Sequence, residues 1–267
     1  MASTEQTRFI GFPPPLLGGR PQRLPVLGCE PGQWLALDKP ADVLTERHRW
    51  YPGMPALVPA LNAQAEAGKP ELEPYGVTEA RHVYILEPEI SGVLLLALSD
   101  ERLQQLREAY GSGQMRFRFG FLAQWRGGPE ERSSQLPVAV HNTEARALIS
   151  HQSGKKCRTR FRLVERLGDY AWWEASATYL RPHQIRLHAA ELGLPAVGDA
   201  LYGGPEPICL SMLKRDYRQR GIERPLYDGL CLHLEGLEAN LPGQAIRLEA
   251  GLPKGLAVLR RRLLMHA

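Results

Sequence analysis

The side chains best suited to chemistry are concentrated between Arg181 and His188, where the sequence reads Arg-Pro-His-Gln-Ile-Arg-Leu-His. Arg186 carries a planar guanidinium that can hold a carboxylate through two parallel hydrogen bonds. His183 and Gln184 can hydrogen-bond to a ligand or to the neighbouring backbone, and the sequence leaves both roles open. Arg186 could also be an ordinary surface charge of a helix.

The candidate carboxylates are Glu87 and Glu89, in the turn-forming sequence Glu-Pro-Glu-Ile-Ser-Gly that ends at Gly92. Apolar runs at 82–86 and 93–98 flank this sequence, which predicts a strand, a loop and a buried strand. By itself, Glu87 at the end of the first run is an ordinary polar residue of a strand end. Glu89 is the competing choice, and either residue could be an ordinary solvated acid of a loop.

A second concentration of charge lies at residues 155–166, although the net charge of the whole chain is only +4. Its cations are Lys155, Lys156, Arg158, Arg160, Arg162 and Arg166. The arginines at 158, 160 and 162 alternate with less polar residues, which predicts a strand with one basic face and one inward face. This basic strip could contact the phosphates of a nucleic acid, or it could be a solvated strand face.

The elements that would position these residues are strands with a few helices between them. Capping residues and apolar spacing predict helices at 57–67, 99–111 and 182–193. Apolar or alternating runs predict strands at 34–37, 117–125, 158–164 and 170–180. Residues 127–157 are expected to form a long excursion with a short hairpin, and the arginines at 260–262 to end an amphipathic helix.

Residues 1–28 are rich in proline and glycine, which is typical of an extended, loosely ordered arm. Residues 29–267 are then expected to form one domain. The chain has neither a run of about 18 apolar residues nor the layout of a signal peptide, so we expect a cytoplasmic protein outside the membrane. Its four cysteines lack zinc-site spacing, so no metal is expected.

The segment 181–188 and its continuation, Leu-Pro-Ala-Val-Gly-Asp-Ala-Leu-Tyr-Gly at 194–203, resemble a motif of the RluA-type pseudouridine synthases. That family reads Gly-Arg-x-His-Gln-(Leu/Ile)-Arg-x-His, followed by Leu-Gly-x-Pro-(Ile/Val)-x-Gly-Asp-x-x-Tyr-Gly. Residues 38–42 resemble the family's Asn-Lys-Pro-x-Gly segment, and residues 231–234 resemble its Leu-His-Ala strand. Together these pieces place the resemblance over residues 34–245.

The resemblance implies an α+β fold in which a mixed, largely antiparallel sheet with flanking helices carries a central RNA-binding cleft. It implies conversion of uridine to pseudouridine in RNA without a metal or an organic cofactor. The expected partner is a structured ribosomal or transfer RNA, bound by a monomer. The expected RNA-binding residues are Lys155, Lys156, Arg158, Arg160, Arg162, Arg181, His183 and Gln184.

The segment that resembles the family's catalytic motif, His-Arg-Leu-Asp-x-x-(Thr/Ser)-Ser-Gly, differs from it here. Aligned on its Ser-Gly pair, the catalytic aspartate corresponds to Glu87 and the base-displacing arginine to Ile85. The family's Lys-x-Tyr-x-Ala segment corresponds to Phe-Gly-Phe-Leu-Ala, which places Phe121 at the tyrosine. Arg186 matches the arginine that pairs with the catalytic carboxylate. The expected catalytic residues are therefore Glu87, Arg186 and Phe121, although Phe121 is equally compatible with the core.

These departures leave two hypotheses. The chain is either a pseudouridine synthase with a rearranged site or a catalytically silent relative that binds RNA. Glutamate is one methylene longer than aspartate, and a displacement of about 1 Å can cost on the order of 10²-fold in rate. Phenylalanine lacks the phenol that could transfer a proton. An unrelated enzyme is disfavoured, because the sequence has no phosphate-binding glycine loop and no nucleophile elbow.

Overall fold

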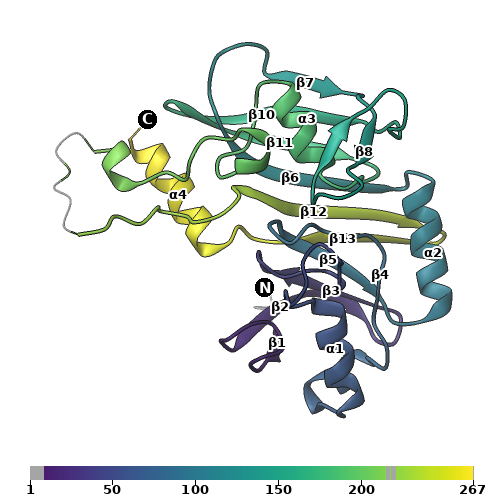
Figure 1. Ribbon diagram of the computed structural model, residues 1–267. Coiled ribbons are helices and arrows are strands. Elements are labelled where there is room, and N and C mark those ends of the chain that lie inside the picture. The colour runs from purple at the N-terminus through teal and green to yellow at the C-terminus, as the bar shows by residue number, and fades with distance from the viewer. Residues whose placement is uncertain (1–8, 215–216, 218–220, 267) are drawn as a thin grey trace, which may run out of the picture. The chain divides into compact units, whose positions relative to one another are not determined.

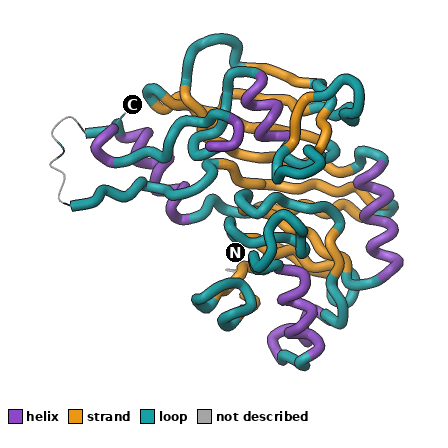
Figure 2. Tube along the Cα trace, in the orientation of Figure 1, coloured by secondary structure: helices purple, strands orange, loops and turns teal. Residues whose placement is uncertain are grey.

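The computed structural model describes residues 9–214, 217 and 221–266 (Figures 1 and 2). The described chain divides into two compact units. Unit 1 contains residues 9–115 and 236–250, and unit 2 contains residues 116–235 and 251–266. The sequence did not indicate this division, because unit 1 is built from two stretches that are far apart along the chain.

Unit 1 is built on antiparallel strands. β1 (Phe9–Phe12) pairs with β2 (Gln22–Glu30), β2 with β3 (Trp34–Lys39), and β3 with β5 (Ser91–Ala97). β4 (Arg81–His82) adds a short pairing to β5. β13 (Gln244–Glu249) pairs with the end of β12 (Leu232–Leu241). All seven residues of β5 are buried, as expected for an apolar strand covered on both sides.

The helices of unit 1 follow the local signals in the sequence. α1 (Leu57–Glu66) and α2 (Asp100–Gly111) occupy the two segments where helices were predicted. Ser99 is the N-cap of α2, and its Oγ accepts a hydrogen bond from the backbone N–H of Arg102 at 3.2 Å. A 3₁₀ helix at Pro70–Tyr75 ends at Gly76, whose positive φ of 62° suits glycine.

The N-terminal segment differs from its prediction. Residues 9–28 were expected to be a loosely ordered arm, but they contribute β1 and most of β2. Ile10 and Phe12 are fully buried, and Leu24 is nearly so. The expectation is therefore wrong for residues 9–28, because the apolar residues between the prolines and glycines find a sheet to pack on. Residues 1–8 lie outside the described residues.

Unit 2 contains a second antiparallel arrangement. β6 (Met115–Gln124), which begins at the last residue of the first stretch of unit 1, pairs with β11 (Tyr170–Ala177). β11 pairs with β10 (Thr159–Leu167), and β10 with β7 (Glu131–Ser134). The predicted hairpin in the 127–157 excursion is confirmed as β8 (Val138–Val140) with β9 (Ala147–Ile149). The expected α+β class with mostly antiparallel pairing is confirmed.

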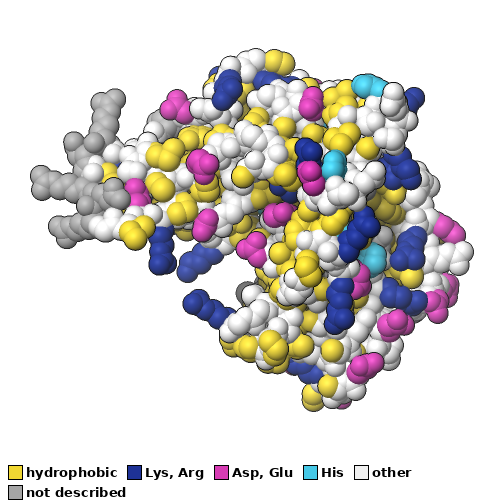
Figure 3. Space-filling model, in the orientation of Figure 1, with side chains coloured by type: hydrophobic (Ala, Val, Ile, Leu, Met, Phe, Trp, Pro, Cys, Tyr) yellow, Lys and Arg dark blue, Asp and Glu magenta, His cyan; other side chains and the backbone are white. Residues whose placement is uncertain are grey.

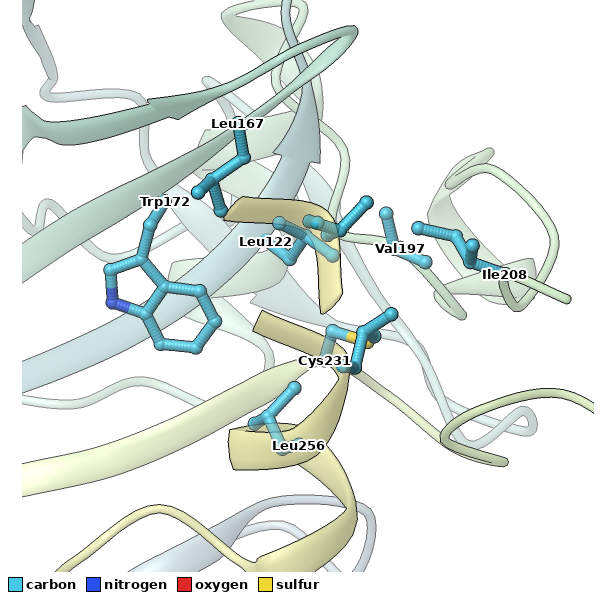
Figure 4. Close-up of a cluster of buried hydrophobic side chains, with 9 residues drawn as sticks. Leu122, Leu167, Trp172, Val197, Ile208, Cys231 and Leu256 are labelled. Carbon is cyan, nitrogen blue, oxygen red and sulfur yellow. The ribbon is translucent and has the colours of Figure 1, made fainter. Parts of the chain in front are cut away.

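The β10–β11–β6 sheet of unit 2 has two different faces. One face carries Phe121 of β6 and Phe161 of β10, whose ring centroids lie 5.9 Å apart in an edge contact. α3 (Gln184–Glu191) packs on this face and lies in front of β10 in Figure 1. The other face carries Leu122 and Trp172, which belong to a core cluster completed by α4 (Lys254–Met265) (Figure 4). Two 3₁₀ helices, Ala200–Tyr202 and Leu210–Met212, complete the unit.

One strand prediction was too long. The apolar run 82–86 was expected to be a strand, but the ladder of β4 includes only Arg81 and His82. The residues that follow are still buried at 83, 84 and 86, so their apolar character reflects packing without strand pairing.

Candidate functional site

Glu87 lies in a turn of unit 1 that is held mainly through its backbone. Thr45 Oγ donates to the carbonyl of Leu86 at 3.0 Å and accepts from the Leu86 N–H at 3.1 Å. On the other side of Glu87, the Pro88 carbonyl accepts from the N–H of Asp42 at 2.8 Å, and the Ile90 N–H closes the turn on the Glu87 carbonyl at 3.1 Å. These bonds fix the backbone on both sides of Glu87 and leave its side chain half-buried.

A buried lysine lies beneath this turn. Lys39 is fully buried, and its Nζ donates to the carbonyls of Val43 at 2.6 Å, Pro40 at 2.9 Å and Pro88 at 3.3 Å. Burial lowers the pKa of Lys39 to about 7, while the carboxylates of Glu89 and Glu87 oppose that shift. Burial also raises the pKa of the neighbouring Asp38 to about 6, against the attraction of Lys39. The Glu87 turn thus lies beside a cation whose charge changes near neutral pH.

The two residues before Leu86 are placed in opposite ways. Tyr84 is buried, and its hydroxyl donates to the Val93 carbonyl at 2.7 Å, so burial raises the pKa of Tyr84 well above its usual range. Ile85 instead has 56% of its surface exposed. A large apolar residue at an exposed position adds little to the core, so the backbone of this segment would accept a polar side chain there.

Arg186 lies on α3 in unit 2 and is paired with a carboxylate that the sequence analysis did not assign to it. Its Nε and one terminal nitrogen donate to the two oxygens of Asp199 at 2.9 and 2.7 Å. Arg186 is only 4% exposed, and the side chain of Asp199 is fully buried. This bidentate, desolvated ion pair sets the position of the guanidinium before any substrate binds.

His183 belongs to the same network. It precedes α3 in a left-handed conformation with φ of 58°, and its Nδ1 lies 2.9 Å from the hydroxyl of Tyr202. That hydroxyl also contacts the backbone of Ala147 and thereby reaches the β8–β9 hairpin. Burial, reinforced by the positive charge of Arg186, lowers the pKa of His183 to about 3, so its imidazole is neutral at physiological pH.

Gln184 links α3 to β10. Its Nε2 donates to the carbonyl of Arg158 and to Thr159 Oγ, both at 3.1 Å, and its Oε1 accepts from the N–H of Arg181 at 2.8 Å. Thr159 Oγ lies 2.9 Å from Nδ1 of His188. Both side chains are buried. Gln184 bonds to the local backbone, as in the alternative considered for it, whereas His183 bonds to the Tyr202 hydroxyl. The RNA contacts of both residues stay predictions.

Phe121 is a core residue in this structure. Only 1% of its surface is exposed, and it packs against Phe161 on the α3 face of the sheet. Of the two interpretations left open by the sequence, core packing or a stacking platform, this geometry favours core packing.

The basic strip has the alternation that was predicted. Arg160 and Arg162 are exposed, whereas Thr159 and Phe161 are buried. Arg158, Lys155 and Lys156 precede the strand and are also exposed. Arg162 donates to Glu174 at 3.0 Å, so one arginine of the strip already has an acidic partner. Because Gln184 meets Thr159 on the other face of β10, Arg160 and Arg162 lie on the face that α3 does not cover.

Arg181 is the remaining predicted contact. Its guanidinium lies 4.5 Å from the ring centroid of Tyr179, a cation–π geometry, and the side chain is half-buried. Together with His183 and Gln184 it marks the beginning of α3.

The structure therefore groups the predicted residues in three places. Glu87 lies in unit 1, Arg186 and Phe121 lie on the α3 side of unit 2, and the basic strip lies on the opposite face of the unit 2 sheet. The expected ion pair between Glu87 and Arg186 stays a prediction. Sequence reasoning missed Lys39, Thr45 and Asp199 as site residues. Lys39 and Asp199 stood within segments already recognised as motifs, but their partners are set by the fold.

The fold resembles that of solved pseudouridylate synthases. The human RNA pseudouridylate synthase domain containing 4 aligns with a TM-score of 0.67 and 18% identity over 89% of this chain and 92% of that chain. The human RNA pseudouridylate synthase domain containing 1 aligns with a TM-score of 0.58 and 20% identity over 86% and 84%. At this identity the likeness defines the fold, which is the pseudouridine synthase fold.

Sequence comparison finds relatives with related names. Ribosomal large subunit pseudouridine synthase D of Haemophilus ducreyi is 35% identical over 161 residues, or 60% of this chain and 45% of that protein. An uncharacterized RNA pseudouridine synthase of Chloroflexus aurantiacus is 32% identical over 154 residues, or 57% and 47%. No protein-family model matches the chain. The chain is therefore similar in sequence to RNA pseudouridine synthases, and its resemblance to the RluA type is confirmed.

Two further findings concern the length of the chain and its helices. The chain spans about half the length of the curated relatives it matches. In the part of the chain that the structure describes, no helix combines the length and apolar character needed to cross a bilayer.

Proposed function

We propose that this protein is an RNA pseudouridine synthase that isomerises a uridine within a ribosomal or transfer RNA. The observation that carries the proposal is the sequence likeness to ribosomal large subunit pseudouridine synthases. The buried Arg186–Asp199 pair supports it, because it presents a guanidinium in a fixed position at the segment that carries the family motif.

The reaction breaks the C–N bond between the ribose and the uracil, turns the detached base, and forms a C–C bond from carbon 5 to the same sugar carbon. The proton on carbon 5 then leaves and a ring nitrogen gains one, so atoms and charge balance within the nucleoside. The reaction therefore requires a carboxylate, a positioned base and a closed site, and it consumes no cofactor.

In this proposal Glu87 supplies the carboxylate, and Arg186, held by Asp199, supplies a fixed guanidinium. Glu87 stands on a turn whose backbone is fixed by Thr45 and Lys39, so its longer side chain is the part that must adapt to the substrate. Phe121 supports the site as an apolar residue, packed on Phe161, and brings no proton-transfer group. The rate is accordingly expected to be low for the family.

RNA would also contact the basic strip. Arg158, Arg160 and Arg162 with Lys155 and Lys156 are exposed, but the strip faces away from α3. We therefore assign it to phosphates distant from the target nucleotide. Alanine at the three arginines should flatten the dependence of log affinity on log salt, by roughly 0.7–0.9 for each phosphate that the variant no longer neutralises. An unchanged slope would assign the strip to solvent.

A catalytically silent RNA-binding relative is the second candidate. Two observations favour it. Ile85 exposes an apolar side chain where the family motif has the arginine that displaces the base, and Phe121 lacks the phenol and is buried. Such a protein would keep the fold and the basic strip and lose turnover.

The deciding experiment measures pseudouridine in RNA from cells with and without this protein, and in purified RNA treated with wild type or Glu87→Gln. Product that is made by wild type and lost in Glu87→Gln supports the synthase with Glu87 as its carboxylate. RNA binding without product supports the silent relative. In that case the triple change Ile85→Arg, Glu87→Asp and Phe121→Tyr is expected to restore some turnover.

A cytoplasmic location, where ribosomal and transfer RNA are found, and a monomeric state complete the proposal. Size-exclusion chromatography coupled to light scattering tests the second of these, because an RNA-independent dimer would contradict it.

A further inference from the structure

The loop between β3 and α1 carries the sequence Arg47-His48-Arg49-Trp50-Tyr51, which has no counterpart in the motifs described above. Cations alternating with aromatic rings are the composition that binds single-stranded nucleic acid, because the cations meet phosphates and the rings stack on bases. The same composition could be a solvated loop. The structure distinguishes these possibilities by showing how the loop is held and what lies beneath it.

The loop is anchored at its base. The N–H of Leu44 donates to the Pro55 carbonyl at 2.9 Å, and the N–H of Leu57 donates to the Leu44 carbonyl at 2.8 Å. These bonds join the beginning of the loop to its end. Within it, the N–H of Tyr51 donates to the His48 carbonyl at 3.1 Å, which forms a turn. A loop closed in this way presents its side chains at a low cost in conformational entropy when a ligand binds.

The aromatic rings of the loop are ordered against one another. The rings of His48 and Trp50 meet edge to face with centroids 4.7 Å apart, and the rings of His48 and Tyr51 lie 6.2 Å apart. The Arg49 guanidinium lies 5.7 Å from the Trp50 ring centroid. The loop therefore holds its rings and cations as a small preformed cluster.

A cavity of about 560 Å³ lies under this cluster, within the range of about 300–1,000 Å³ typical of small-ligand sites. Arg47, His48, Arg49 and Tyr51 line one part of it, and Leu16 with residues of the loop and α1, including Met54 and Ala60, lines the rest. Among the residues that the structure describes, the lining contains no acidic residue. The adjacent Glu46 instead approaches His82, with 3.9 Å between its carboxylate and the imidazole Nδ1.

We propose that this cavity binds one unpaired nucleotide of the RNA substrate, with its base against Tyr51 and its phosphate against Arg47 and Arg49. This site rests on the proposed RNA substrate and lies within unit 1. The choice follows from the chemistry of the lining. A planar, anionic ligand satisfies both the aromatic and the cationic side chains, whereas bases within a duplex have no exposed face to stack.

In Figure 3, Lys and Arg side chains are interspersed with Asp and Glu side chains on the face that is drawn. Individual basic side chains on this face should therefore be separable by mutation.

The test measures the affinity of a short fluorescent single-stranded oligouridylate for wild type, Tyr51→Leu, Tyr51→Phe and the double variant Arg47→Gln/Arg49→Gln. Tyr51→Leu should weaken binding by about 5- to 100-fold, the range expected for one stacked base, and Tyr51→Phe should keep wild-type affinity. The double variant should lower the salt slope by about 1. Arg247→Gln, an exposed arginine of β13 in the same unit, is the matched control and should change neither. Thermal unfolding verifies that each variant folds.

The outcomes separate this inference from the proposed function. Normal affinity of Tyr51→Leu and of the double variant would overturn the site, even if wild type makes pseudouridine. Weakened affinity with no pseudouridine product would support the site and contradict the synthase. Equal affinity for a blunt duplex of the same sequence, or binding of oligoglutamate together with no oligouridylate binding, would also overturn it. Full competition by uridine monophosphate would assign the cavity to a free nucleotide and overturn the RNA site.

Discussion

The Glu87 turn of unit 1 and the α3 segment of unit 2 both carry family motifs, but they are held by different kinds of contact. Around Glu87 the turn is tied through main-chain atoms, with Thr45 bonded to the backbone of Leu86 and Lys39 to the carbonyl of Pro88. Around α3 the motif side chains bond to one another, as in the Arg186–Asp199 pair and the contact of His183 with Tyr202.

This difference predicts which segment tolerates substitution. The bonds from Thr45 and Lys39 are made to the backbone of the turn, so the turn is expected to keep its shape when the side chains at 85 and 87 change. A network of buried polar side chains depends on each member, since removal of one leaves its partner unsatisfied. The α3 segment is therefore expected to tolerate fewer substitutions than the Glu87 turn.

The largest expected effect comes from breaking the α3 network. Asp199→Leu leaves the Arg186 guanidinium buried without its carboxylate, which should lower the free energy of unfolding by about 3–5 kcal/mol. The double variant Arg186→Leu/Asp199→Leu removes both charges, so its free energy of unfolding should fall less than that of Asp199→Leu alone. Denaturant unfolding of the two variants measures this. A double variant as unstable as the single one would contradict the proposed dependence.

A smaller loss is expected where the Glu87 turn is anchored. Thr45→Val keeps the shape of the side chain but removes both hydrogen bonds to Leu86, and it should cost about 1–3 kcal/mol. Thr45→Ser retains the hydroxyl and is the matched control. In denaturant unfolding, the free energy of unfolding should decrease from wild type to Thr45→Ser to Thr45→Val. If Thr45→Val were as stable as Thr45→Ser, other contacts would hold the backbone of this turn.

The third effect is a pH dependence in the α3 network. The folded state lowers the pKa of His183 from its ordinary value of 6.5 to about 3, so between those values the unfolded chain binds the extra proton. Stability contributed by neutral His183 is therefore present above pH 6.5 and is lost as pH falls toward 3. Between pH 7 and pH 5.5 the loss should be about 1 kcal/mol.

His183→Asn tests this, because asparagine accepts the left-handed conformation and does not titrate. The free energies of unfolding of wild type and variant are measured at pH 7 and pH 5.5, and the loss between these values should be smaller in the variant. Parallel pH dependences would contradict a neutral, buried His183.

The smallest effect is expected at Ile85. Its side chain is largely exposed, so Ile85→Arg should change the free energy of unfolding by less than about 0.5 kcal/mol. The same variant is part of the activity test for the silent relative, so its stability can be measured on the same preparation. A loss of several kcal/mol would show that this turn depends on its side chains after all, and the comparison with α3 would fail.

Local signals predicted much of the fold. The cap at Ser99 and the proline and glycine around α3 marked two helices, and alternation marked β10 and β11. The N-terminal strands were not predicted, because the prolines and glycines around the buried Ile10 and Phe12 suggested a loosely ordered arm. The strand predicted over 82–86 was too long, because apolar composition indicates burial and does not show whether a pairing strand is adjacent.

For the site, the sequence by itself predicted the resemblance to the RluA type and the residues at the motif positions, because both depend on residue types at set spacings. It also determined that Arg160 and Arg162 share a face, since side chains alternate along a strand with period two. Only the tertiary structure decided that α3 covers the other face, that Asp199 holds Arg186, and that Gln184 serves the backbone. Spacing fixes which residues point the same way, but the packing partner of each face depends on how distant segments meet.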